Sequence, residues 1–201
     1  IYAVAQAFEF DSRFQIGYWL GILNKESRYC FDVCGGANCK NLENLISQMT
    51  TQNPLYVDLG LGQINFDTAR GFIDRHFSLY QTGFQKLINV GYFKYLDPKL
   101  QTAEQLQSFL KKKLPRKNQT VAVAQTKTRE FFSLLRKDEK INLALSLPIL
   151  LQKTKEGINL ENLDDKNSRL YLYHTSKKYN KFSEPFYSSI QELPREHQYV
   201  W

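Results

Sequence analysis

The sequence predicts a single, mainly helical domain, all-α in class. Apolar residues recur at helical spacing in several segments, the first being Ile16, Trp19, Leu20 and Leu23 at i, i+3, i+4 and i+7. No segment shows the strong apolar–polar alternation of a half-buried strand. With 201 residues and 42% hydrophobic content, the chain is long and apolar enough to bury a sizeable core. We therefore expect one domain built around helices.

Glu26 lies at the end of the second predicted helix. A first helix is expected over Ile1 to Phe10, and the second ends in the letters NKESRY. At about 100° per residue, Ser27 continues the apolar face and Glu26 lies on its flank, roughly 20° beyond Trp19. Partial desolvation there would raise the carboxyl pKa, as a general acid near neutral pH requires. The alternative is a solvated glutamate with no role.

A glycine-punctuated stretch, GLGQIN (Gly60 to Asn65), follows about three dozen residues later. Gly60 and Gly62 permit unusual dihedral angles and close approach of a ligand to the backbone. Gln63 and Asn65 offer amide donors and acceptors for sugar hydroxyls. Such a turn alone is also typical of an ordinary loop. Preceded by an acid at the end of an amphipathic helix, it indicates a sugar-cleaving site.

Three cysteines lie between these two features, at Cys30, Cys34 and Cys39. An odd count allows one disulfide with a spare thiol, three reduced thiols, or a metal site. Only three histidines are available to complete a zinc shell, so the metal site is the least favoured. We predict no metal ligands and no cofactor.

The middle of the chain predicts further helices over Phe72 to Leu87, Ala103 to Lys113 and Val121 to Leu135. We interpret residues 72–135 as a helical insertion over or beside a cleft, and residues 180–201, with scattered aromatics around two prolines, as an extended tail packed on the same domain.

The net charge of +7 indicates an anionic partner. The densest basic run is KKKLPRK, with Lys111, Lys112, Lys113, Arg116 and Lys117. We interpret it first as a solvated helix end followed by a turn at Pro115, and second as a patch that attaches to an anionic polymer of the cell wall. A nucleic-acid site is the last interpretation, because no recognisable nucleic-acid-binding motif surrounds the run. No run approaches the ~18 apolar residues that a membrane span needs.

Four segments, in order and at similar spacing, resemble the lytic transglycosylase and goose-type lysozyme family. The first is the approach to Glu26-Ser27, and the second is GLGQINFDTARGF (Gly60 to Phe72). The third is KDEKINLALSLPILLQK (Lys137 to Lys153), similar to a family helix with an Asn-Ile-x-x-Gly core. The fourth is SRLYLYHTS (Ser168 to Ser176), which places Tyr173 on a family tyrosine.

The chain departs from the family pattern in each of the last three segments. Gly62 replaces a methionine, Ser146 and Pro148 interrupt the third motif, and His174-Thr175-Ser176 replaces Asn-Ala-Gly. The lost methionine bears on the shape of the sugar subsite.

The resemblance implies a lysozyme-like fold of the α+β superfamily and cleavage of peptidoglycan between N-acetylmuramic acid and N-acetylglucosamine. Glu26 would act as general acid and base of a lytic transglycosylase. In the alternative, a hydrolytic muramidase that acts on native or deacetylated glycan, Asp58 would activate water; otherwise Asp58 is a loop residue that caps a turn. Ser27, Gly60, Gly62, Gln63, Asn65 and Tyr173 would bind substrate.

Two other classes remain open: an envelope protein that binds glycan without turnover, and a helical nucleic-acid-binding protein. The retained acid disfavours the first, and we expect no nucleic acid as partner. Because the chain begins at Ile1 and not at methionine, we expect that a leader or upstream region has been removed and that the protein is exported to the periplasm, cell envelope or medium.

Overall fold

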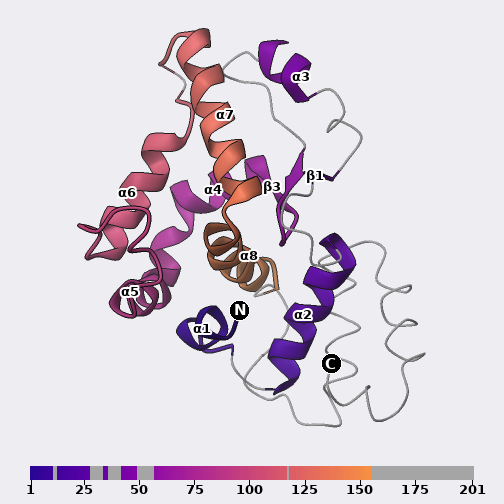
Figure 1. Ribbon diagram of the computed structural model, residues 1–201, viewed down its shortest axis with the longest axis vertical. Coiled ribbons are helices and arrows are strands. Elements are labelled where there is room, and N and C mark those ends of the chain that lie inside the picture. Colours follow the sequence, from indigo (N-terminus) through magenta and orange to yellow (C-terminus); the bar gives the residue numbers. More distant parts are fainter. Residues whose placement is uncertain (11–12, 28–33, 36–41, 49–56, 117, 155–201) are drawn as a thin grey trace.

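The computed structural model describes residues 1–10, 13–27, 34–35, 42–48, 57–116 and 118–154. Helix accounts for 71% of the described residues, which confirms the mainly helical class. The elements are α1 (Tyr2–Ala7), α2 (Arg13–Ser27), β1 (Cys34–Gly35), α3 (Leu42–Gln48), β2 (Asp58–Leu59), β3 (Ile64–Asn65), α4 (Phe66–Arg75), the 3-10 helix η2 (Phe77–Tyr80), α5 (Gln81–Asn89), α6 (Ala103–Lys113), α7 (Val121–Lys137) and α8 (Glu139–Thr154) (Figure 1).

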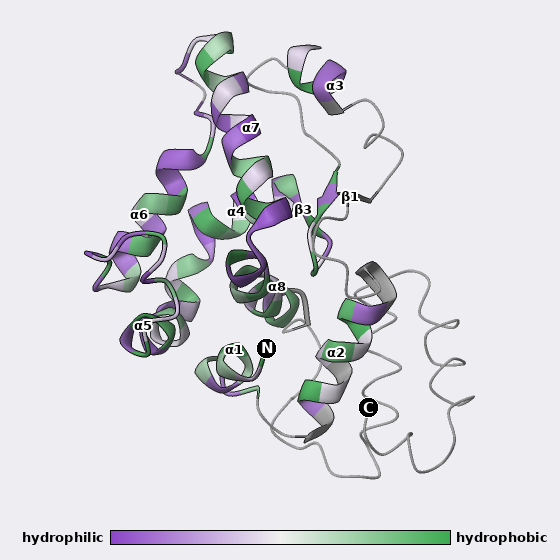
Figure 2. Cartoon of the chain, viewed as in Figure 1, coloured by the Kyte–Doolittle hydropathy of each residue, from purple (hydrophilic) through white to green (hydrophobic). Residues whose placement is uncertain are grey.

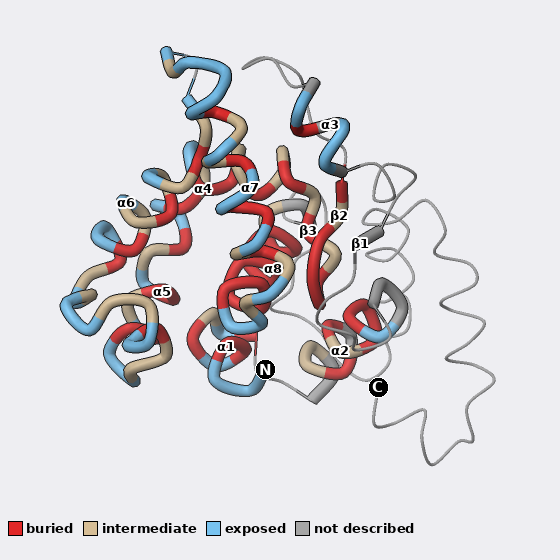
Figure 3. The backbone as a smooth tube through the Cα atoms, turned by 45° about the horizontal axis from the view of Figure 1, so that its top comes forward, coloured by how far each residue is buried: buried red, intermediate tan, exposed pale blue. Residues whose placement is uncertain are grey.

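Helix α8 forms the centre of the described part of the molecule. Every residue from Ile141 to Leu151 is buried, so the helix is enclosed on all sides (Figure 3). It packs against α1, α4, α7 and β3. Its residues are mostly hydrophobic, whereas α6 and α7 alternate between hydrophobic and hydrophilic residues (Figure 2). The helix continues through Pro148 to Thr154, although proline removes one backbone donor.

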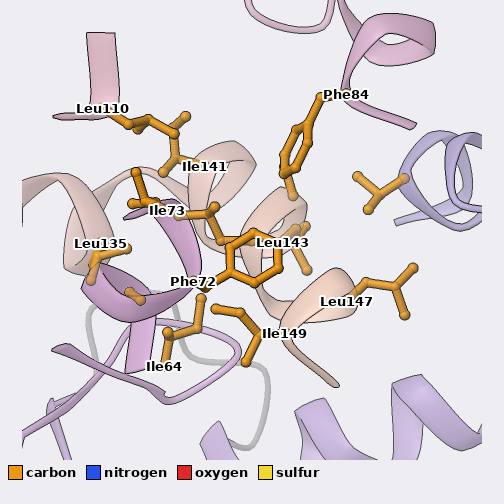
Figure 4. Packing of buried hydrophobic residues seen from close by; sticks show 14 of the residues in the cluster. Ile64, Phe72, Ile73, Phe84, Leu110, Leu135, Ile141, Leu143, Leu147 and Ile149 are labelled. Atoms are coloured by element: carbon orange, nitrogen blue, oxygen red, sulfur yellow. The ribbon is translucent and has the colours of Figure 1, made fainter. Parts of the chain in front are cut away.

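The segment 72–135 shares this core. Its side chains Phe72, Phe84 and Leu135 meet residues of α8 in one apolar cluster (Figure 4). Helix α5 packs against α1, where Phe84 contacts the ring of Phe8 edge to face at 5.1 Å between centroids. Gly83 admits this contact, because an added Cβ would collide with the Phe8 ring. These helices therefore help to build the core, and their status as an insertion stays a prediction.

Two of the three helices predicted in the middle of the chain are confirmed. Helix α6 spans the predicted range and begins with a capping box between Thr102 and Gln105. Helix α7 covers the predicted range and continues to Lys137. The basic run begins, as predicted, at the end of a helix: Lys112 is exposed, whereas Lys113 is half-buried and pairs with Glu130 at 3.2 Å.

The predicted continuous helix over Phe72 to Leu87 is wrong. Helix α4 ends at Arg75, the 3-10 helix follows, and α5 begins at Gln81. A 3-10 helix has three residues per turn, so Phe77 and Tyr80 lie on the same side of it, and both are buried. Burial of these two rings thus accounts for the break. The first helix is also shorter than predicted, since it covers Tyr2–Ala7 and Glu9 has a φ of 57°.

A small antiparallel sheet, which the sequence did not predict, lies beside the helices in the order β1-β2-β3. Each strand has two residues, too few to produce a pattern of alternation. Among the described residues, no helix is long and apolar enough to cross a membrane.

Candidate active site

The stretch from Gly60 to Gln63 is the turn between β2 and β3. The backbone N–H of Gln63 donates to the carbonyl of Gly60 at 3.1 Å, and the Gln63 side-chain amide donates to the same oxygen at 2.8 Å. Gly60 has a φ of +69°, which favours glycine, and Gln63 has a φ of +43°, which is uncommon for a residue with a side chain. Leu61, between the glycines, is buried. The turn is therefore closed by its own hydrogen bonds.

The side chain of Asn142, in α8, forms a hydrogen bond with this turn. Its side-chain oxygen accepts from the N–H of Gly62 at 2.6 Å, and its side-chain nitrogen donates to the carbonyls of Leu59 and Leu135, each at 2.8 Å. The residue is fully buried. A buried amide with three partners is strongly oriented, because each lost bond would leave a desolvated polar group. Asn142 thus joins the turn, the end of α7 and α8.

Both glycines of the turn are required by packing. A Cβ at Gly60 would collide with the carbonyl of Leu135 and the amide of Asn142, and a Cβ at Gly62 would lie 2.6 Å from the Cβ of Ser146. On this side the space is filled by α7 and α8. Close approach of a ligand from the opposite side of the turn stays a prediction.

The register of the sheet aligns polar positions on one face. Asp58 pairs with Asn65 on one side and with Gly35 on the other, and directly opposed residues share a face. Asp58 and Asn65 are half-buried, whereas Leu59 and Ile64, on the other face, are buried. Gly35 adds no side chain to the row. Asp58 and Asn65 therefore form a polar row on one face of the sheet.

Asn65 has a structural role that the sequence reading missed. Its side-chain oxygen accepts from the N–H groups of Asp67 and Thr68 at 3.1 and 3.3 Å and so caps the N-terminus of α4. The amide nitrogen remains the group that could donate to a ligand.

The predicted acid lies in α2. Glu26 is the penultimate residue of the helix, and it follows Ile22 and Leu23 by one turn and Trp19 by two. These three residues are buried and define the buried face of α2. Ile16 and Leu20, also predicted on this face, are half-buried. In the view of Figure 1, the C-terminal end of α2 is the end nearer to the small sheet.

The structure brings Asp58, Gly60, Gly62, Gln63 and Asn65 together in one hairpin. The side chains of Glu26 and Ser27, and the whole of Tyr173 and of the tail 180–201, lie outside the described residues. Cys30 and Cys39 also lie outside them, so the three alternatives for the cysteines stay open. In the described part of the chain, no three His, Cys, Asp or Glu residues gather as metal ligands.

Asn142 and Ser146 belong to the site but were not among the predicted site residues. The available signal was a pair of polar residues, four apart, within the apolar run INLALSLPILL. An amide in such a run must find partners when the helix is buried.

Comparison of the chain with protein-family models, curated proteins and solved structures gives no match.

Proposed function

We propose that the protein is a lysozyme-like enzyme that cleaves the glycan strand of peptidoglycan, with Glu26 as general acid and base. The observation that carries the proposal is the contact between two of the family-like segments. The turn of GLGQIN is hydrogen-bonded through Gly62 to Asn142, in the segment that resembles the third family motif, 80 residues further along the chain. Two motifs of one catalytic family would be expected to meet in this way.

The positions of the acid and the sheet support the same chemistry. Glu26 follows the buried residues Ile22 and Leu23 by one turn of α2, and desolvation at such a position would favour its neutral, proton-donating form. Asp58 and Asn65 form a polar row on the small sheet, to which this end of α2 is the nearer one in the view of Figure 1. A glycosidase needs an acid that protonates the glycosidic oxygen and polar groups that bind the sugar, and we assign these roles to Glu26 and to the Asp58–Asn65 row.

In the reaction that we favour, Glu26 gives its proton to the leaving glycosidic oxygen as the C–O bond breaks. The acetamido oxygen of the muramic residue stabilises the oxocarbenium-like centre. Glu26 then takes the proton of the 6-hydroxyl, whose oxygen bonds to C1 and closes a 1,6-anhydro ring. No water is consumed and no second carboxylate is required.

Asp58 supports hydrolysis as the second candidate. Asp58 is half-buried, lies on the face of the sheet away from the buried Leu59, and is paired with Gly35. In inverting glycosidases a second carboxylate stands roughly 6.5–9.5 Å from the acid and activates a water. A muramidase of this kind would release reducing muramic ends and would not need the acetamido group.

The test is clearance of purified sacculi by the Glu26→Gln variant. Glutamine matches glutamate in size but cannot donate the carboxylic proton, so we expect loss of clearance with an unchanged melting temperature. Glu104→Gln, an exposed glutamate on α6, is the matched control and should retain activity. Full activity of Glu26→Gln would eliminate this residue as the acid, and inactivity of the unmodified chain with retained sacculus binding would indicate a glycan-binding protein.

Mass spectrometry of the fragments separates the two reactions. Ends lighter by one water indicate the anhydro product, and these should disappear when the substrate is deacetylated. Reducing muramic ends that are lost in Asp58→Asn would show that the enzyme is a muramidase.

A further inference from the structure

A second surface feature lies apart from the hairpin. An open groove of about 810 Å³ runs between α6, the C-terminal half of α7 and the start of α8, and we call it the Tyr95 groove. None of the predicted site residues of the hairpin lines it. Its volume falls in the range of about 300–1,000 Å³ that is usual for small-molecule sites.

Aromatic rings line this groove on two sides. Tyr95 is 50% exposed, and Phe109 of α6 is half-buried. The Tyr95 hydroxyl donates to the carboxylate of Asp138, whose two oxygens lie at 2.6 and 2.8 Å. Burial, and then this hydrogen bond, raise the pKa of the Tyr95 hydroxyl well above its usual range, so it remains a donor. The ring is therefore held in place before any ligand binds.

The hydrogen bond also ties the groove to the core. Asp138 accepts from the N–H of Ile141 at 3.0 Å and so caps the first turn of α8. Lys140 places its ammonium 4.9 Å from the centroid of the Tyr95 ring. A partly exposed ring with a fixed hydroxyl loses little conformational entropy when a ligand covers it.

The charges of the groove are balanced. Three lysines, at 113, 137 and 140, face three carboxylates, at 130, 138 and 139. Lys113 and Glu130 already form an ion pair at 3.2 Å. Balanced walls do not concentrate a polyanion such as nucleic acid, which requires a cationic surface. They do offer donors and acceptors to the hydroxyls and amides of a neutral ligand.

We propose that the Tyr95 groove binds a neutral oligosaccharide of N-acetylhexosamine units. The apolar C–H faces of the sugar rings would cover the sides of Tyr95 and Phe109 away from Lys140 and Lys113. The charged side chains and the Ser133 hydroxyl would form hydrogen bonds with the polar substituents of the sugar. The choice of sugar rests on the proposed function. A second glycan site on the same chain holds the enzyme on a polymer between cuts, because the next binding event becomes intramolecular.

The experiment uses the full chain as the Glu26→Gln variant, so that the probe, chitotetraose, is not consumed. Backbone amide signals are followed by NMR during titration. We expect saturable shifts at residues 133–140 in addition to those of the hairpin at 60–65. Ser133→Trp, which fills the groove from an exposed position on α7, should weaken binding there about tenfold or more and leave the hairpin shifts unchanged. Ala122→Trp, at an exposed position of α7 outside the groove, is the control and should change neither the affinity of the groove nor the shifts of the hairpin.

Absence of shifts at 133–140, or equal affinity in Ser133→Trp, would overturn the proposal. Saturable shifts there with a stem peptide or a short DNA strand in place of the sugar would overturn the ligand class. The result is separable from the proposed function: sacculus cleavage without groove shifts refutes the groove alone, and groove shifts without cleavage refute the catalytic role alone.

Discussion

Replacement of Gly62 by alanine tests whether the hairpin is pressed against α8 as tightly as the geometry indicates. The new Cβ would lie 2.6 Å from the Cβ of Ser146. Carbon atoms in contact prefer about 3.5–4.0 Å, so roughly 1 Å of overlap must be relieved. Neither atom is the end of a flexible side chain, and the turn is held by the Asn142 hydrogen bond. We expect a loss of about 1–3 kcal/mol in the free energy of unfolding, the usual cost of overpacking.

Ser146→Gly should rescue the alanine variant. Alone, this change costs about 1 kcal/mol, because glycine is a poor helix former and the Ser146 hydroxyl bond to the Leu143 carbonyl is lost. Combined with Gly62→Ala, it opens the space that the new methyl group needs. The double variant should therefore be more stable than the sum of the single changes predicts, by about 1 kcal/mol or more, as for residues in contact.

The measurement is urea denaturation of the four proteins of the cycle, with the m-value checked for constancy. Gly60→Ala is the matched control. Its Cβ would collide with the backbone carbonyl of Leu135 and its φ is +69°, so Ser146→Gly cannot relieve it and the two changes should be additive. Additivity within about 0.5 kcal/mol in the Gly62–Ser146 cycle would refute the proposed contact.

Three further changes test other parts of the molecule. Asn142→Leu should lower the free energy of unfolding by about 3–5 kcal/mol in the same assay, because it leaves a buried N–H and two carbonyls without their partner; a loss below about 1 kcal/mol would mean that water replaces it. Tyr173→Phe should slow sacculus clearance with little change in melting temperature, and lowered stability with full activity would instead assign Tyr173 to the core. Replacement of Lys111, Lys112 and Lys113 by glutamine should reduce the salt sensitivity of binding to sacculi, whereas unchanged binding would leave the run as a solvated helix end.

The parts of the fold that the sequence predicted are those set by local spacing. Helices α6 and α7 follow from apolar residues that recur once per turn, and Leu106, Leu110 and Leu135 are buried as that pattern requires. The face of α2 was predicted around Trp19 and Leu23 for the same reason. The break between α4 and α5 could not be predicted locally, because the positions of Phe77 and Tyr80 depend on the core that they join.

The candidate site was predictable in its composition but not in its anchoring. The glycines of the turn were recognised as a motif, whereas the reason for them lies in α7 and α8, far along the chain. Gly62 and Ser146 were two separate departures from the family pattern, and the structure shows that they contact each other. The three bonds of Asn142 also reach residues that sequence spacing does not connect.

The position of Asn142 explains how one helix can serve both the core and the site. A turn that binds a ligand needs a geometry that does not change when the ligand arrives, and such rigidity comes from packing behind the turn. Here the hairpin is hydrogen-bonded to the buried helix α8, so moving the turn would leave the fully buried Asn142 side chain without partners. Asp138, four residues before Asn142, caps the same helix and fixes the ring of Tyr95. The hairpin and the Tyr95 groove therefore share one support, the N-terminal part of α8.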